Sequence, residues 1–325
     1  MELDKIMRKT YFINELGYPD GCHTFDVHRL PQAYMHHLNW HSLSYDSIQT
    51  TKLEADCILI FQTPCNDELR KLLIIKQFIK QYTCCITQES SIFDWFDWPA
   101  AEQELYIDIL SQCSAFLYHN EHDKKVMQVF CTQFVKYPGC VNLTTDSYKQ
   151  IEDGQFILIP NPVKRYQRGM IVHKLVADCV TDSTIYSMKY TAPKHISLSF
   201  PDAYSLPNIN MLNWMNKEQW FQCIYSCKFG VDIHRDFSGA NVALEFASLA
   251  TPLIGNIELD AQRDIFPDIS FEYRDYENIR KSINMLQHDK DFYKEVSKKA
   301  LENVKILYNS KYITNQFFDN LNETI

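Results

Sequence analysis

Short, continuous apolar runs alternate with helical stripes along the first half of the chain, and this alternation constrains the fold more than any other feature. The run DCILIFQ (56–62) stops at Thr63-Pro64, as a strand buried on both faces does. A broad apolar stripe then predicts a helix from Asn66 or Asp67 to about Gln81. The same pattern predicts strands at 10–14, 83–88 and 114–119 and helices at 100–111 and 121–134. Regular alternation of this kind predicts a parallel, doubly wound α/β sheet.

The second half restarts the pattern after FILIPNPV (156–163), where two prolines stop a central strand because they lack a ladder donor. We therefore expect a domain junction there, with one domain at 1–160 and another at 161–310, which suits a chain of 325 residues. Further helices are expected at 168–181, 216–226, 240–249, 276–287 and 290–308, and strands at 184–189, 195–200, 229–233 and 251–255.

Composition narrows the classes of protein that fit. The net charge of −9 argues against a general nucleic-acid coat, although a local basic groove is compatible with it. No run approaches the ~20 apolar residues that span a bilayer. The 11 cysteines lie mostly in apolar runs and the N-terminus lacks the apolar region of a signal peptide, so we expect reduced thiols in a cytoplasmic protein. A zinc site at Cys22, His23 and His28 is the alternative, but no CxxC pair supports it.

The stretch FGVDIHRDFSGANVALEFASLATPLIGN (229–256) carries the most chemistry: a strand, a polar loop, a helix and a second short strand. In an open parallel sheet, ligands bind beyond the carboxyl ends of the strands, where this loop lies. Backbone N–H groups at the helix start would face an anion, and Glu245 could accept hydrogen bonds from the hydroxyls of a ribose. The candidate ligand-binding residues are His234, Asp236, Ser238, Gly239, Ala240, Asn241 and Glu245. The alternative is that Glu245 is an ordinary exposed helix residue.

The segment EFASLATPLI (245–254) resembles the donor-binding element of retaining GT-B glycosyltransferases, in which two glutamates separated by seven residues span the loop and the helix. Glu245 matches the second glutamate, whereas the first falls on Phe237, one residue after Asp236. The resemblance implies two Rossmann-like domains facing across a cleft, with a nucleotide-sugar donor, most simply a UDP-sugar, on the second domain. It also implies that no metal or cofactor is needed, and that 311–325 forms a helix crossing back to the first domain.

Basic residues follow the expected junction. GT-B enzymes place an arginine and a lysine of this domain on the donor pyrophosphate, and Arg168 and Lys174 are the candidates. A solvated basic face is the alternative.

Polar residues after two expected strands of the first domain are candidates for the acceptor side. Glu89 follows the strand at 83–88 and could act as the general base, with Asp94 and Asp97 as alternatives. His23 lies in a glycine-containing loop that is similar to one in compact bacterial and phage glycosyltransferases, and it could contact phosphate or act as an acid or base. A structural histidine is the competing interpretation of His23.

The sequence thus predicts a hexosyl- or pentosyltransferase that uses a hydroxyl acceptor. By analogy of fold and size, the acceptor could be a hydroxymethylated pyrimidine in phage DNA, in the cytoplasm of the host cell. Lysines that could serve DNA binding are Lys71, Lys76, Lys80, Lys124, Lys125 and Lys136. A glycan or small-molecule acceptor is the alternative, as is a non-catalytic sugar-nucleotide-binding protein, which Phe237 favours. The sequence does not give the oligomeric state.

Overall fold

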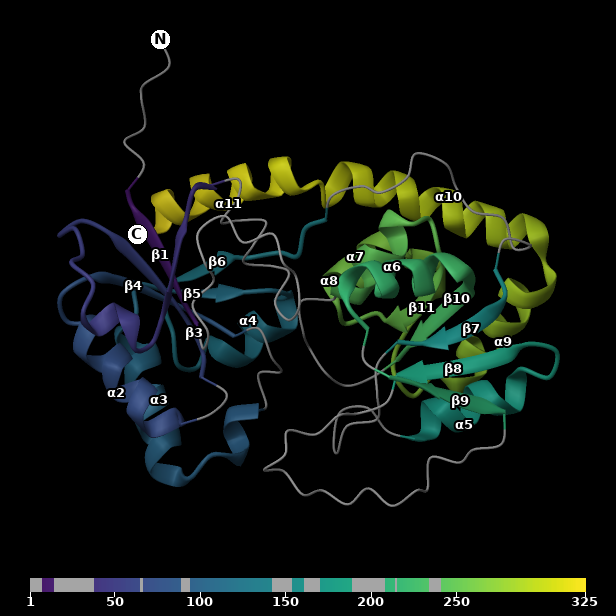
Figure 1. The fold of residues 1–325 in the computed structure, drawn as a ribbon, viewed down its shortest axis with the longest axis horizontal. Helices are drawn as coiled ribbons and strands as arrows, with labels where there is room; N and C mark the ends of the chain where they lie inside the picture. The colour runs from purple at the N-terminus through teal and green to yellow at the C-terminus, as the bar shows by residue number, and fades with distance from the viewer. Residues whose placement is uncertain are drawn as a thin grey trace, which may run out of the picture. The chain divides into compact units, whose positions relative to one another are not determined.

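The computed structural model of the protein describes residues 8–14, 38–64, 67–88, 94–141, 154–160, 170–188, 208–213, 215–233 and 241–325. They form two compact units, each with its own sheet (Figure 1). The first unit runs to Cys140 and also contains Ser310–Ile325, and the second lies between Val141 and Asn309. All strand pairs recorded in the two sheets are parallel. The predicted α/β class with two doubly wound parallel sheets is therefore confirmed.

The first sheet has six strands in the order β2-β1-β3-β4-β5-β6. Their bounds are β1 Thr10–Asn14, β2 His41–Ser44, β3 Ile58–Gln62, β4 Thr83–Thr87, β5 Ala115–Tyr118 and β6 Phe134–Lys136. The helices of this unit are α2 Glu68–Phe78, α3 Ala100–Gln112, α4 Glu121–Met127 and α11 Ser310–Thr324, with short 3-10 turns at Ser47–Gln49 and Asp94–Asp97.

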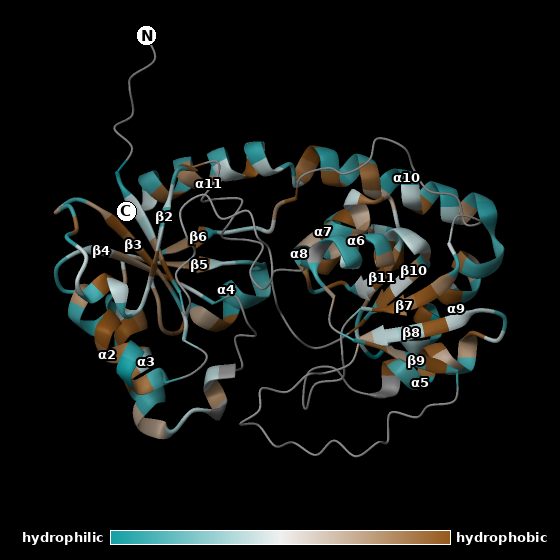
Figure 2. Ribbon diagram, in the orientation of Figure 1, coloured by the Kyte–Doolittle hydropathy of each residue, from teal (hydrophilic) through white to brown (hydrophobic). Residues whose placement is uncertain are grey.

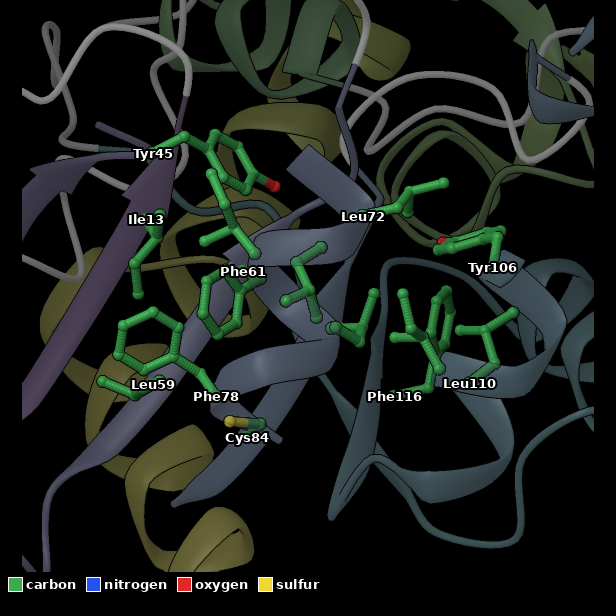
Figure 3. Packing of buried hydrophobic residues seen from close by; sticks show 14 of the residues in the cluster. Ile13, Tyr45, Leu59, Phe61, Leu72, Phe78, Cys84, Tyr106, Leu110 and Phe116 are labelled. Atoms are coloured by element: carbon green, nitrogen blue, oxygen red, sulfur yellow. The ribbon is translucent and has the colours of Figure 1, made fainter. Parts of the chain in front are cut away.

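Alternate residues of the central strands enter two separate cores, because successive side chains of a strand point to opposite faces. On one face, Leu59 and Phe61 of β3 pack with Leu72 of α2 and Tyr106 of α3 (Figure 3). On the other face, the core formed by residues such as Ile60 contains the apolar side of α11. Burial on both faces explains why β3 reads as a continuous apolar run, and Figure 2 shows this strand in the brown of hydrophobic residues.

The second sheet has the order β12-β11-β10-β7-β8-β9. Its strands are β7 Phe156–Ile159, β8 Thr184–Met188, β9 Ile209–Leu212, β10 Cys227–Asp232, β11 Leu253–Asn256 and β12 Ser270–Phe271. Its helices are α5 Met170–Cys179, α6 Lys217–Ser226, α7 Asn241–Ser248, α8 Asp260–Ile265, α9 Tyr276–His288 and α10 Lys290–Leu307. Counted along the chain, this is the order 3-2-1-4-5-6 of dinucleotide-binding sheets.

A glycine in β10 sets the distance between the sheet and helix α7. A Cβ atom at Gly230 would lie 2.5 Å from Cε1 of Phe246 on α7 and 2.6 Å from Cδ1 of Leu253 on β11. Real Cβ atoms do not approach other atoms so closely, so only glycine lets α7 pack this tightly. Helix α7 is thereby held close to β10 at Phe246.

The structure differs from the sequence prediction at several elements. The helix expected at 121–134 ends at Met127, and residues 134–136 form the edge strand β6 beside β5. Strand β7, expected to close the first domain, pairs with β10 and β8 in the second sheet, and the units divide at Cys140. The strand expected at 195–200 lies outside the described residues, and β2, β9, β12 and α8 have no counterpart in the prediction.

Candidate functional site

The topology of the second sheet points to one edge as a ligand site. The chain builds one side of the sheet from β7 through β9 and then returns to build the other side from β10, so the order reverses between β7 and β10. Ligands of open parallel sheets bind beyond the carboxyl ends of the strands at such a switch point. β7 ends at Ile159 and β10 at Asp232. The segment 234–240 connects this end of β10 to α7. The predicted ligand-binding loop therefore follows β10, which we call the switch strand.

Helix α7 carries Glu245, one of the residues predicted to bind the donor. Glu245 is 3% exposed, which excludes the interpretation of it as an exposed helix residue. Its Oε2 accepts a hydrogen bond of 2.5 Å from the indole Nε1 of Trp220 on α6. A buried carboxylate requires hydrogen-bonding partners because desolvation of the charge is costly. Sequence reasoning missed Trp220, since no local pattern links two residues on different helices.

The other residues predicted at this edge divide into two groups. Asn241 is the first residue of α7 and is half-buried. The remaining loop residues lie outside the described part of the chain, and their roles stay predictions: His234, Asp236, Ser238, Gly239 and Ala240.

Helix α5 presents Lys174 to solvent. Its ammonium forms an ion pair with the carboxylate of Asp178 one turn along the helix, and the side chains are 59% and 48% exposed. This geometry is compatible with both the pyrophosphate role and the solvated-face alternative, because an exposed pair of this kind is weak. The neighbouring His173 is buried, and its Nε2 lies 2.8 Å from Oγ of Ser187 on β8. Arg168 lies outside the described residues.

The carboxyl edge of the first sheet carries a row of polar side chains that sequence reasoning missed. Gln62 of β3 pairs with Thr87 of β4, and the register of β1 extends the row to Asn14. His119, the residue directly after β5, continues the row. The side chains of these four residues are at most 8% exposed. In each strand the polar residue follows an apolar one two positions earlier, on the face where α11 packs. That switch at the strand end was the available sequence signal.

His119 is held as a neutral group. Burial lowers its pKa to about 4, against smaller opposing effects of the backbone carbonyls of Tyr137 and Gln88. Its Nδ1 lies 2.8 Å from the Tyr137 carbonyl oxygen, and the two rings are tilted by 34° with their centroids 5.4 Å apart. The edge of the first sheet therefore offers neutral hydrogen-bonding groups.

The predicted acceptor-side residues are less defined. His23 and Glu89 lie outside the described residues, and Asp94 begins the 3-10 turn Asp94–Asp97. Trp95 in that turn is 2% exposed and meets Tyr106 and Phe130 edge-on, so its ring belongs to the core.

Metal ligands and membrane spans can be assessed only where the chain is described. There, no group of three or more histidine, cysteine, aspartate or glutamate side chains is arranged to hold a metal ion. The proposed zinc ligands Cys22, His23 and His28 fall outside that part. The nine cysteines within it are free thiols. None of its helices combines the length and apolar character needed to cross a membrane.

Comparison with known proteins supports the fold. No protein-family model matches the chain, and no curated protein sequence matches it. Among solved structures, sucrose-phosphate synthase from Thermosynechococcus elongatus superposes with a TM-score of 0.73 at 12% identity, over 97% of this chain and 98% of that one. HepE from Anabaena, in complex with UDP and glucose, gives a TM-score of 0.68 at 10% identity, over 97% of this chain and all of that one. Trehalose 6-phosphate synthase from Burkholderia multivorans gives 0.63 at 9% identity, over 83% and 72%.

These structures share two parallel-sheet α/β domains with the chain described above. The chain therefore has the GT-B fold, as the resemblance in the sequence implied. Identities of 9–12% show the fold alone, and function must be argued from the site.

Proposed function

We propose that the protein is a glycosyltransferase that moves a sugar from a UDP-sugar to a hydroxyl acceptor. The observation that carries this proposal is Glu245, a buried carboxylate on the helix that follows the switch strand of the second sheet. A carboxylate at that place suits the vicinal hydroxyls of a ribose, because it is an acceptor-only group facing two donors. Support comes from the fold, since a structural neighbour was solved with UDP and glucose.

The other predicted residues receive roles in this proposal. The loop after β10 and the first N–H groups of α7 bind the donor phosphates, with help from Arg168 and Lys174 as the leaving UDP gains charge. Glu89 acts as the general base or aligns the acceptor hydroxyl, and His23 and Asp94 are the alternative candidates for this role. Transfer is of a hexosyl group with retention, which is the outcome that the resemblance around Glu245 implies. Basic groups neutralise the pyrophosphate in this scheme, and no metal or cofactor takes part.

For the acceptor, we propose a neutral glycan or small molecule ahead of DNA. The polar row of the first sheet, which includes Gln62 and Thr87, consists of uncharged groups, and these suit hydroxyls better than phosphates. Several lysines that a DNA surface would need have other contacts. Lys71 is 3% exposed with its Nζ 5.6 Å from the ring centroid of Tyr45, and Lys76 forms a 3.0 Å ion pair with Asp108.

A thermal-shift screen of UDP-, GDP-, ADP- and CMP-sugars tests the donor. A ligand at ~100 times its Kd adds about 2.7 kcal/mol to the stability of the unit that binds it, which corresponds to about 5–10 °C in Tm for a domain of this size. We expect that shift with a UDP-sugar, and a shift at most about half as large in Glu245→Gln at the same concentration. Equal shifts in wild type and variant would remove Glu245 from the donor site, and no shift with any donor would contradict the proposed function.

A further inference from the structure

The carboxylate of Glu245 is held by a partner from a second helix. Trp220 is 6% exposed, and the 2.5 Å bond from its indole N–H to Oε2 of Glu245 lies in the interior of the second unit. A hydrogen bond with an ionised acceptor is about twice as strong as one between neutral groups. The indole is a donor only, so its N–H must meet an acceptor when it is buried.

The position of Trp220 is fixed by the start of helix α6. Asn216 and Gln219 form a capping box, in which each side chain bonds the backbone N–H of the other residue. The backbone N–H of Trp220 also donates a hydrogen bond of 2.9 Å to the backbone carbonyl oxygen of Asn216. The indole therefore projects from the first turn of a well-terminated helix, which limits its freedom to move away from Glu245.

The two helices lie on either side of the switch strand in the chain. Helix α6 runs directly into β10, and α7 follows β10 and packs against α6. Gly230 of β10 lets Phe246, the neighbour of Glu245, pack closely against the strand. Both members of the pair are thus placed by the strand that leads to the candidate site.

We propose that Trp220 is a positioning residue for Glu245 and that it sets the selectivity of the donor site for a ribose with both hydroxyls. This inference rests on the proposed function, in which Glu245 binds the ribose. The bond to one carboxylate oxygen holds the carboxylate in a single orientation, so that binding the two hydroxyls of a ribose requires no further ordering of this side chain. Stability alone gives no reason to bury a charge here, because an apolar pair would avoid the desolvation.

Calorimetric titration with UDP and 2′,3′-dideoxy-UDP measures this selectivity as the ratio of two Kd values. We expect wild type to prefer UDP by about tenfold to a hundredfold, the range for hydrogen bonds to a charged group. Trp220→Phe should lower the ratio at least threefold by weakening UDP binding, with the dideoxy nucleotide bound as before. Tyr225→Phe is the matched control, since Tyr225 lies on the same helix and is 50% exposed, and its ratio should equal that of wild type.

Each outcome decides one question. A Trp220→Phe variant that keeps the wild-type ratio, whatever its Tm, has lost only packing, and the inference is wrong. If Phe prevents folding, 3-benzothienylalanine at position 220 keeps the shape of the indole without its N–H, and the same ratio applies. If Glu245→Gln keeps the wild-type ratio, the ribose is bound elsewhere and the inference falls while UDP binding stands. If wild type binds no UDP, the proposed function itself is contradicted.

Discussion

Burial of His119 makes the stability of the first unit depend on pH. Burial lowers the pKa of His119 to about 4, below the ordinary value of about 6.5 that it regains on unfolding. Above pH 6.5 both states are neutral and the histidine contributes no pH dependence. Below that value the unfolded chain takes up a proton that the folded one does not, so the free energy of unfolding falls as the pH drops from 6.5 to 4.

The size of this effect can be measured by urea unfolding of wild type and His119→Gln between pH 4 and 7. Wild type should lose about 1.4 kcal/mol per pH unit once the pH is well below 6.5, in addition to what other groups contribute. The variant should lack that contribution, because glutamine does not titrate but can still donate to the Tyr137 carbonyl. Parallel profiles for the two proteins would show that His119 is not held neutral in the folded state.

At the scale of elements, helix α11 completes the first unit although it follows the whole second unit in sequence. Phe317 on α11 is 1% exposed, and its ring lies 5.7 Å from that of Trp40 and 5.2 Å from that of Tyr137. The apolar face of the helix thus covers one side of the first sheet.

Removing that ring should destabilise the first unit. Phe317→Ala should cost about 3–5 kcal/mol, because it leaves a cavity beneath two other aromatic rings. Tyr312→Ala on the same helix is the control, since Tyr312 is 59% exposed and surface changes stay within about 0.5 kcal/mol. Amide hydrogen exchange should show faster opening of β1 and β3 in Phe317→Ala, with β7 and β10 unchanged. Equal effects of the two substitutions would mean that α11 does not cover the first sheet in solution.

Sequence reasoning predicted elements best where one local pattern decides them. The apolar run of β3 and the apolar stripes of α9 and α10 can be recognised locally, because burial on both faces of a strand gives a continuous apolar run and burial of one helical face gives a period of 3.6 residues. Strand β7 shows the limit. The two prolines that follow it mark the end of the strand. Its pairing with β8 and β10, however, depends on contacts between residues that are far apart in the sequence. The three-residue strand β6 is too short to carry a period of its own.

At the scale of the whole molecule, the candidate site shows the same contrast between residues that a local motif identifies and residues that come together only on folding. The motif around Glu245 was visible in the sequence, and with the restart of the strand-helix pattern it pointed to the GT-B fold. The contact of Trp220 with Glu245 was not visible, because residues from separate helices meet only in the folded chain. The polar row ending at His119 left only a weak signal, the change from an apolar to a polar residue at the end of each strand. The identity of the acceptor is the hardest property to predict from the sequence, because its recognition depends on many contacts between residues of separate elements.

The central claim is catalysis of sugar transfer, and release of UDP from a UDP-sugar measures it most directly. Purified wild type should release UDP slowly in water and faster when a simple glycoside is added, with the sugar recovered on the glycoside. Hydroxymethylated DNA should give a smaller increase, and Glu245→Gln should lower release at subsaturating donor, because removing a charged hydrogen-bond acceptor costs about 1.5–3 kcal/mol of binding. A protein that binds the UDP-sugar but releases no UDP with any acceptor or with water would be a non-catalytic binder, and that result would contradict the account.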